Sequence, residues 1–293
     1  MKGVVWGPAE PGAWNDDNVW APDVFEDEGQ YYLYYSANMR IGVAVADDPT
    51  GPFVDVYDQP FIGTGHGGVP FLAIDAHAFR DDDGALYLYT TGYHPFSFIR
   101  VFTMVDPVTV NEDWTELIGP KFFGWETFIN EGAWIVKHGG VYYLMYSGND
   151  VRIPFYAIGY AMSDSPLGPF VKYERNPILH VNWEHEFYGP GHNSAVEGPD
   201  GDLWIFYHTK LNPGQNLLRR VRKNRLRFTG DGQLWVDIGL GPPPPFPVDD
   251  DDQDDEVEPT DDDTGDGDAA TGDDDDSTAS DDDDDDDSNG CGC

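Results

Sequence analysis

The sequence predicts an all-β protein of the β-propeller class, followed by a disordered acidic tail. Three observations lead to this fold class. The first is a pattern that occurs four times in the first 240 residues, with a period of roughly fifty residues. The second is a Gly-containing turn inside every copy, and the third is a sharp change of composition at residue 241. No segment shows a helical period that would support more than a turn or two of helix.

Each copy of the repeat contains a short apolar approach, a strand, a tight turn and a strand rich in aromatic residues. The turns are Glu28-Gly29, Asp83-Gly84, Gly139-Gly140 and Asp200-Gly201. Such dipeptides favour hairpins because glycine adopts positive φ angles easily. The aromatic strands are expected at residues 31–36, 86–90, 141–147 and 203–208. Two copies continue into a third strand and a Gly-Pro-Phe phrase, at residues 41–53 and 158–170.

The polar positions of the repeat are expected to meet on the propeller axis. In a propeller the innermost strand of each blade lines the central channel, so equivalent positions of successive blades converge. We assign Asp23, Asp75, Glu131 and the pair His192 and Asn193 to one equivalent position. The sequence therefore predicts that these residues, which are far apart in the chain, lie close together.

The charge of the chain is unevenly distributed. The 293 residues carry a formal net charge of −39, and of the 55 acidic side chains 24 lie from Asp249 onward, where no Lys or Arg occurs. The remaining part is moderately acidic, which argues against nucleic-acid binding because phosphate contacts need clustered Lys and Arg. The basic residues at 219–225 are typical of the outer face of a strand. No apolar stretch reaches the roughly 18–20 residues of a membrane span.

The sequence divides into a propeller domain at residues 1–240 and a tail at residues 241–293. The tail begins with four prolines and continues as Asp runs broken by Ser, Thr and Gly, a composition that cannot bury enough apolar surface to fold. Its last five residues, with Cys291 and Cys293, resemble the Cys-containing sorting tails of some bacterial surface proteins. We therefore expect an extracellular or cell-surface location, although no secretory signal follows Met1.

Several short motifs resemble one known family. They are Trp-Ala-Pro-Asp-Val at 20–24, Ala-Ile-Asp at 73–75, Glu-Gly-Ala-Trp at 131–134, Gly-Pro-Gly-His-Asn-Ser at 189–194 and the two Gly-Pro-Phe phrases. In their order and spacing these motifs resemble glycoside hydrolase family 43 over nearly all of residues 6–240. The resemblance implies a five-bladed propeller that hydrolyses arabinose- or xylose-containing plant polysaccharides with inversion at the anomeric carbon.

The resemblance also implies three carboxylates: a general base, a general acid, and an Asp that orients the acid and raises its pKa. Matched by motif, Glu131 is the general acid and Asp75 the modulator, with Ala76 where the family usually has Pro. The family's base lies in the first blade, and few residues precede Trp20 here. Asp23 belongs to the second-blade motif, so no residue takes the base role. We therefore expect that most of the first blade is missing, with the base and the signal peptide, and that about four blade signatures remain.

Each of these residues also has a plainer structural interpretation. Glu131 could instead fix the end of a strand, and Asp75 could instead accept backbone hydrogen bonds at the channel mouth. We favour a catalytic role for both residues. Asp23 either binds sugar hydroxyls or packs beneath Trp20. The resemblance places His192 beside a bound cation, often calcium, in many relatives, and a buried histidine is the alternative.

Four aromatic residues are candidates for stacking on sugar rings, with the hydrophobic core as the alternative: Trp20, Trp134, Phe96 and Tyr188. The candidate substrate-binding residues are therefore Asp23, Trp20, Trp134, His192 and Asn193. We expect a monomer that acts on a poly- or oligosaccharide and requires no cofactor, with a structural calcium ion in the channel as an option at His192. The rival hypothesis is a non-catalytic carbohydrate-binding propeller without a base, which predicts saturable binding and no turnover.

Overall fold

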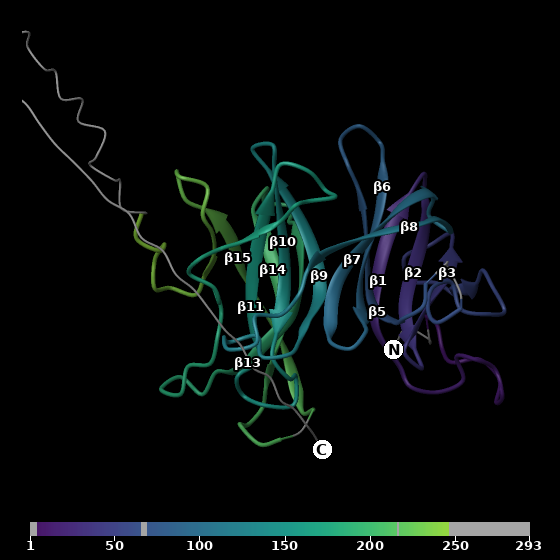
Figure 1. The fold of residues 1–293 in the computed structure, drawn as a ribbon, viewed down its shortest axis with the longest axis horizontal. Coiled ribbons are helices and arrows are strands. Elements are labelled where there is room, and N and C mark those ends of the chain that lie inside the picture. The colour runs from purple at the N-terminus through teal and green to yellow at the C-terminus, as the bar shows by residue number, and fades with distance from the viewer. Residues whose placement is uncertain (1–4, 66–68, 216, 246–293) are drawn as a thin grey trace, which may run out of the picture. The chain divides into compact units, whose positions relative to one another are not determined.

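The computed structural model describes residues 5–65, 69–215 and 217–245, and these residues form sixteen β-strands and no helix. The strands make four antiparallel sheets, and each sheet contains four strands that are consecutive in the chain. Figure 1 shows the sheets following one another like blades, from the purple first sheet to the green fourth. The predicted all-β class is therefore confirmed for the described residues, which also contain no helix that could cross a membrane.

Each sheet begins with a strand that lies innermost and continues outward as a meander. The first sheet contains β1 (Val19–Asp27), β2 (Gln30–Ala37), β3 (Arg40–Ala46) and β4 (Val54–Asp55). The second contains β5 (Leu72–Arg80), β6 (Leu86–Tyr93), β7 (Ser97–Asp106) and β8 (Thr109–Ile118). The third contains β9 (Asn130–His138), β10 (Val141–Gly148), β11 (Ala157–Ser163) and β12 (Val171–Lys172). The fourth contains β13 (Tyr188–Glu197), β14 (Leu203–Lys210), β15 (Arg219–Phe228) and β16 (Leu234–Asp237).

The first hairpin of each sheet turns at the dipeptide that the sequence predicts. The φ angle is 81° at Gly29, 88° at Gly84, 83° at Gly140 and 74° at Gly201, all in the left-handed region that favours glycine. These four turns set the antiparallel register of β1 with β2, β5 with β6, β9 with β10 and β13 with β14. The aromatic strands therefore lie second in each sheet.

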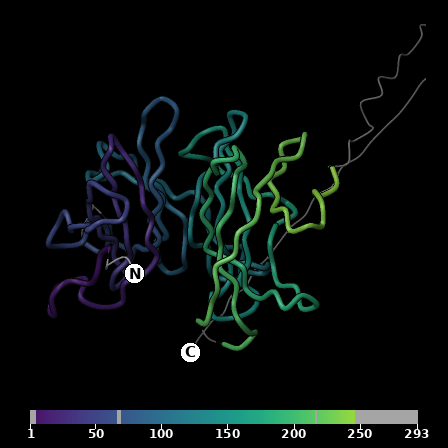
Figure 2. Tube along the Cα trace, turned by 180° about the vertical axis from the view of Figure 1, so that it is seen from behind, coloured from purple at the N-terminus to yellow at the C-terminus, as the bar shows by residue number. Residues whose placement is uncertain are grey.

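The hydrophobic core lies between facing sheets. Tyr34 packs with Leu88 between the first and second sheets, Tyr89 with Leu144 between the second and third, and Tyr160 with Ile205 between the third and fourth. The other face of the first sheet is covered by the segment before β1, whose Trp6 and Trp14 rings lie 4.1 and 5.9 Å from the ring of Tyr35. Figure 2, from behind, shows the same order of sheets along the chain.

A β-bulge occurs at the same step of every innermost strand. In the first sheet Trp20 pairs with Ser36 and Asp23 pairs with Tyr34. The inner strand thus advances three residues where its partner advances two, so the inner strand contains one extra residue. The same shift separates Ile74 from His77, Glu131 from Trp134 and Gly191 from Ser194. The residue after the start of each bulge has a positive φ angle: Ala21 (46°), Asp75 (55°), Gly132 (64°) and His192 (49°). Bulges of this kind redirect side chains, here toward the axis.

This register corrects one expectation from the sequence. Asp75 is equivalent to Gly132 and His192, whereas Glu131 is equivalent to Ile74. Asp23 lies two positions further along its strand than the residue equivalent to Asp75. The assignment of Asp23, Asp75, Glu131 and the pair His192 and Asn193 to one equivalent position is therefore wrong. All four strands share the bulge, and counted from its start Glu131 is the first residue, Asp75 and His192 the second, Asn193 the third and Asp23 the fourth.

Hydroxyl groups of one sheet hold the bulges of the next. The backbone N–H of Asp75 donates to Ser36 Oγ at 3.0 Å, that of Gly132 to Thr91 Oγ1 at 3.2 Å, and that of His192 to Ser147 Oγ at 2.7 Å. A bulge leaves backbone groups outside the ladder, and buried groups of this kind need a partner. The hydroxyls supply it, so the backbone of each site-forming residue is fixed by the preceding sheet.

The chain separates into a compact unit at Met1–Pro245 and a second unit at Phe246–Cys293. All sixteen strands belong to the first unit. The tail predicted from residue 241 lies outside the described residues from position 246 onward.

Candidate active site

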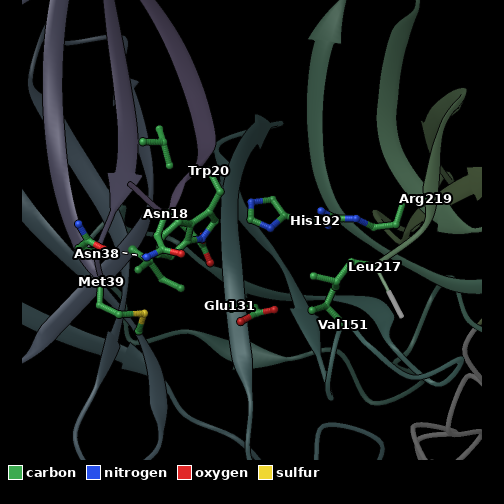
Figure 3. A pocket seen from close by; sticks show the side chains of 12 residues that line it. Asn18, Trp20, Asn38, Met39, Glu131, Val151, His192, Leu217 and Arg219 are labelled. Carbon is green, nitrogen blue, oxygen red and sulfur yellow. Dashed lines mark hydrogen bonds between the residues drawn. The ribbon is translucent and has the colours of Figure 1, made fainter. Parts of the chain in front are cut away.

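A pocket of about 740 Å³ opens at the end of the sheets where the bulges lie, and all four sheets contribute to it. Figure 3 shows Glu131 and His192 in its middle, with first-sheet residues on one side and Arg219 and Leu217 on the other. The lining residues are Asn18, Val19, Trp20, Asn38, Met39, Ile74, Asp75, Glu131, Val151, His192, Leu217 and Arg219. The structure therefore brings together four residues that the sequence singles out: Glu131, Asp75, His192 and Trp20.

Glu131 is held by two tyrosines. Tyr156 Oη donates to Glu131 Oε1 at 2.7 Å, and Tyr93 Oη donates to Oε2 at 3.1 Å. Burial and, as the second cause, the negative charge of Asp75 raise the pKa of Glu131 to about 7, against the hydrogen bond from Tyr156. A carboxyl group with this pKa keeps its proton close to neutral pH, as a general acid must.

Asp75 lies beside Glu131 on the second sheet and is 4% exposed. Its Oδ2 accepts a hydrogen bond from Thr91 Oγ1 at 3.3 Å, and its Oδ1 has no protein partner within the described residues. Burial raises the pKa of Asp75, against hydrogen bonds from Thr91 and from the Gly132 N–H. Two buried carboxyls that sense each other do not ionise independently, so a charge on one favours the proton on the other.

His192 faces the acid across Gly132. A Cβ atom at Gly132 would lie 3.3 Å from His192 Cγ, so the imidazole ring packs directly on the glycine backbone. Burial lowers the pKa of His192, the carboxylate of Glu131 opposes this, and the cation of Arg219 lowers it further. The neutral form is therefore favoured, and an imidazole in that form offers one donor and one acceptor to a ligand.

Three other predicted substrate-binding residues do not line this pocket. Asp23 Oδ2 lies 3.1 Å from His77 Nδ1 and also accepts the N–H of Ala78. The ring of Trp134 stacks on His77 at 3.9 Å, so Asp23, His77 and Trp134 form a chain of contacts among equivalent positions of three sheets. Asn193 is 3% exposed, and its Nδ2 lies 3.5 Å from Met145 Sδ. Asp23 and Trp134 are thus engaged with protein, whereas Asn193 Oδ1 is buried without a hydrogen-bond partner among the described residues.

The described residues do not provide an obvious cation site. In that part of the chain no three or more His, Cys, Asp or Glu side chains converge as metal ligands. Calcium takes six to eight oxygen ligands, often carboxylates and carbonyls. The ring of His192, packed on Gly132, supplies only nitrogen, so the residues present do not fit a calcium ion held by side chains. The calcium expectation at His192 stays a prediction without support from this geometry.

Reasoning from the sequence missed several residues of the site. Tyr93 is the last residue of β6, and Tyr156 directly precedes β11. Both look like core residues in the sequence, so nothing in the local pattern marks them as partners of Glu131. Thr91 and Ser147, by contrast, occupy matching places in the repeat, at or near the end of each second strand. The recurrence of a hydroxyl residue there was a usable signal. Arg219 lay within a basic run interpreted only as the outer face of a strand.

Comparisons with known proteins agree with this geometry. Residues 3–234 match the sequence profile described as Glycosyl hydrolases family 43. A β-D-galactofuranosidase of Aspergillus niger is 34% identical over 232 residues, which span 74% of this chain and 64% of the relative. A xylosidase/arabinosidase 43A of Humicola insolens is 30% identical over 267 residues, 75% of each chain. The crystal structure of a thermostable family-43 glycoside hydrolase superimposes with a TM-score of 0.70 at 36% identity, covering 79% of this chain and 78% of the other.

Proposed function

Because the chain belongs to glycosyl hydrolases family 43, we propose that it is an inverting glycosidase acting on arabinose- or xylose-containing polysaccharides. Relatives named as xylosidase/arabinosidase support this substrate class, and a β-D-galactofuranosidase among them shows that the sugar is not fixed by the family alone. The chain spans about two thirds to three quarters of the length of these relatives.

One observation carries the proposal: Glu131 combines pocket access with a pKa raised to about 7. An acid that must protonate a leaving oxygen near neutral pH needs this combination. The two tyrosines fix both carboxyl oxygens of Glu131, which supports a defined direction for the proton. Burial is the main cause of this pKa, and the charge of Asp75, on the innermost strand of the neighbouring sheet, adds to it.

In the proposed reaction Glu131 gives its proton to the glycosidic oxygen as the bond from that oxygen to the anomeric carbon breaks. A water molecule attacks the anomeric carbon from the opposite face and loses its proton to a base, so the configuration inverts. The carboxyls of an inverting acid and base stand about 6.5–9.5 Å apart to leave room for this water. Hydrolysis transfers no electrons, so the reaction as proposed calls for no redox cofactor.

The proposal leaves the base unassigned. Among the described residues that line the pocket, the carboxylates are Asp75 and Glu131. Asp75 is 4% exposed and its role beside the acid excludes it as the group that activates water. The family resemblance implies a base, and the proposal assigns that role to no residue of the described lining.

The proposal also includes an extracellular location and a monomeric enzyme. Plant polysaccharides are too large to enter a cell, so an enzyme for them acts outside it.

The test is hydrolysis of aryl arabinofuranosides and aryl xylosides, with the anomer of the first product followed by NMR. Turnover that is lost in Glu131→Gln supports the assignment. Turnover that survives this substitution at the full rate on a substrate with a poor leaving group contradicts it. Saturable sugar binding without any turnover would favour the non-catalytic binding propeller.

A further inference from the structure

Two clusters of aromatic rings lie at the end of the sheets where the pocket opens. The Phe cluster consists of Phe96, Phe122 and Phe128, whose rings lie 4.8 to 5.8 Å apart. Phe122 is 42% exposed and Phe128 is 57% exposed. Rings at these distances support one another in a common surface, yet the cluster leaves much of that surface in water.

The Trp cluster consists of Phe155, Trp183 and Tyr188. The Trp183 ring lies 6.2 Å from that of Phe155 and 5.2 Å from that of Tyr188. Phe155 is 51% exposed and Trp183 is 53% exposed. Phe155 lies in the connection between β10 and β11, Trp183 lies in the connection between β12 and β13, and Tyr188 is the first residue of β13.

Exposed aromatic residues are concentrated at this end of the sheets. Among the described residues, six aromatic side chains are strongly exposed, and Phe122, Phe123, Phe128, Phe155 and Trp183 are five of them. The sixth, Tyr57, bonds to the β7–β8 turn at the opposite end of the sheets. Exposed apolar groups gathered in this way mark a binding surface rather than scattered surface residues.

Both clusters adjoin the acid along the chain. Phe128 precedes Glu131 by three residues, and Phe96 follows Tyr93 by three, so each span is at most about 11 Å. Phe155 is next to Tyr156, and Tyr188 precedes His192 by four residues. Since Tyr93 and Tyr156 bond the two oxygens of Glu131, one cluster adjoins each side of the carboxyl group.

We infer that the Phe cluster and the Trp cluster are platforms for sugar residues of a chain that continues beyond the pocket. The substrate is then an oligo- or polysaccharide chain, held by stacking of its apolar C–H faces on these rings while its hydroxyls stay in water. This inference rests on the proposed function for its ligand class. The inference goes beyond the proposed function because it assigns sugar binding to residues outside the pocket lining.

The test compares long and short substrates on three variants. Trp183→Ala and the double variant Phe122→Ala with Phe128→Ala each remove one platform, and Tyr57→Ala is the matched control at the opposite end. We expect each platform variant to raise KM for long arabino- or xylo-oligosaccharides at least about fivefold, with kcat/KM for the aryl monosaccharide unchanged. The control leaves both unchanged. Thermal unfolding of each variant checks that it is folded.

Two results would overturn the inference: an equal loss on the aryl monosaccharide, or no change on the longest oligosaccharide. Binding of oligosaccharides to Glu131→Gln, measured by calorimetry, separates the inference from the catalytic proposal. If no protein turns over any substrate, the proposed reaction fails. In that case the binding data still decide on the platforms. An affinity for oligosaccharides that rises with their length and is lost in Trp183→Ala supports the platforms, and an affinity that does not depend on oligosaccharide length rejects them.

Discussion

The hydroxyl of Tyr156 donates a hydrogen bond of 2.7 Å to Oε1 of Glu131, and the tyrosine is completely buried. This bond favours the ionised carboxylate and therefore opposes the burial that keeps the acid protonated. The hydrogen bond from Tyr156 thus affects both the position of the Glu131 carboxyl group and its pKa. The Tyr93 hydroxyl donates the corresponding bond to the other carboxyl oxygen, Oε2.

Replacing Tyr156 by Phe is expected to raise the pKa of Glu131. The variant loses a donor to the carboxylate, so the basic limb of the kcat/KM profile moves to higher pH. The freer carboxyl also lowers kcat by about tenfold, as loss of a hydrogen bond to a charged group would. A pH–rate profile on an aryl glycoside measures both effects. A limb that moves to lower pH would show that Tyr156 acts in another way.

Glu131→Gln should remove the general acid while keeping the shape of the side chain. General acid catalysis contributes roughly 10²- to 10⁴-fold, so kcat should fall by that amount on a substrate with a poor leaving group. The loss should be smaller on an aryl glycoside whose leaving group needs little protonation. Equal losses on both substrates would argue for a role in binding.

Asp75→Asn should move the basic limb of the pH profile to lower pH. The substitution removes the negative charge that raises the pKa of Glu131, so the acid loses its proton at lower pH. Asn tolerates the left-handed φ of 55° at this position, so the fold should survive. A pH profile of unchanged shape with a lower plateau would contradict a modulating role for Asp75.

The stability of the protein should decline as the pH rises through the titration of Glu131. The pKa of this group is about 7 in the folded state and near 4.3 when unfolded, so between these values the folded state holds a proton that the unfolded state has released. The contribution of Glu131 to the free energy of unfolding is fully present below about pH 4.3 and is lost as the pH rises through about 7. Urea unfolding at pH 5 and pH 8 should show Glu131→Gln gaining stability relative to the parent protein at the higher pH.

Gly132→Ala should damage both stability and activity. The φ of 64° is strained for alanine, and its Cβ would lie 3.3 to 3.4 Å from three atoms of the His192 ring. We expect a loss of about 1–3 kcal/mol in the free energy of unfolding and a displaced imidazole. Gly139→Ala is a useful control, because its φ is similar, 59°, and no atom lies within 4 Å of the added Cβ.

The repeat in the sequence was sufficient to predict the first two strands of each sheet and the hairpin between them. Gly29, Gly84, Gly140 and Gly201 punctuate regular alternating patterns, and local turn chemistry determines such hairpins. The pairing of Glu131 with Asp75 at one site also followed, since innermost strands converge. These features depend on short-range signals that recur along the chain.

The details of the site depended on signals that a single sequence does not display. The strand register decides which positions are equivalent, and nothing in the residue types announces it, because the equivalent residues Ala21, Asp75, Gly132 and His192 share no side-chain chemistry. Likewise, Tyr156 resembles any other buried tyrosine until the fold brings its hydroxyl to Glu131. Long-range packing, rather than local propensity, decides both.

The hydroxyl bonds that run from each sheet to the bulge of the next have a consequence for protein engineering. Because Ser36 fixes Asp75, Thr91 fixes Gly132 and Ser147 fixes His192, no sheet carries its own catalytic geometry. A chimera that exchanges one sheet with a homologue would have to preserve two junctions, the hydroxyl that it provides and the one that it receives. The exchangeable module is therefore the second strand of one sheet together with the first strand of its successor.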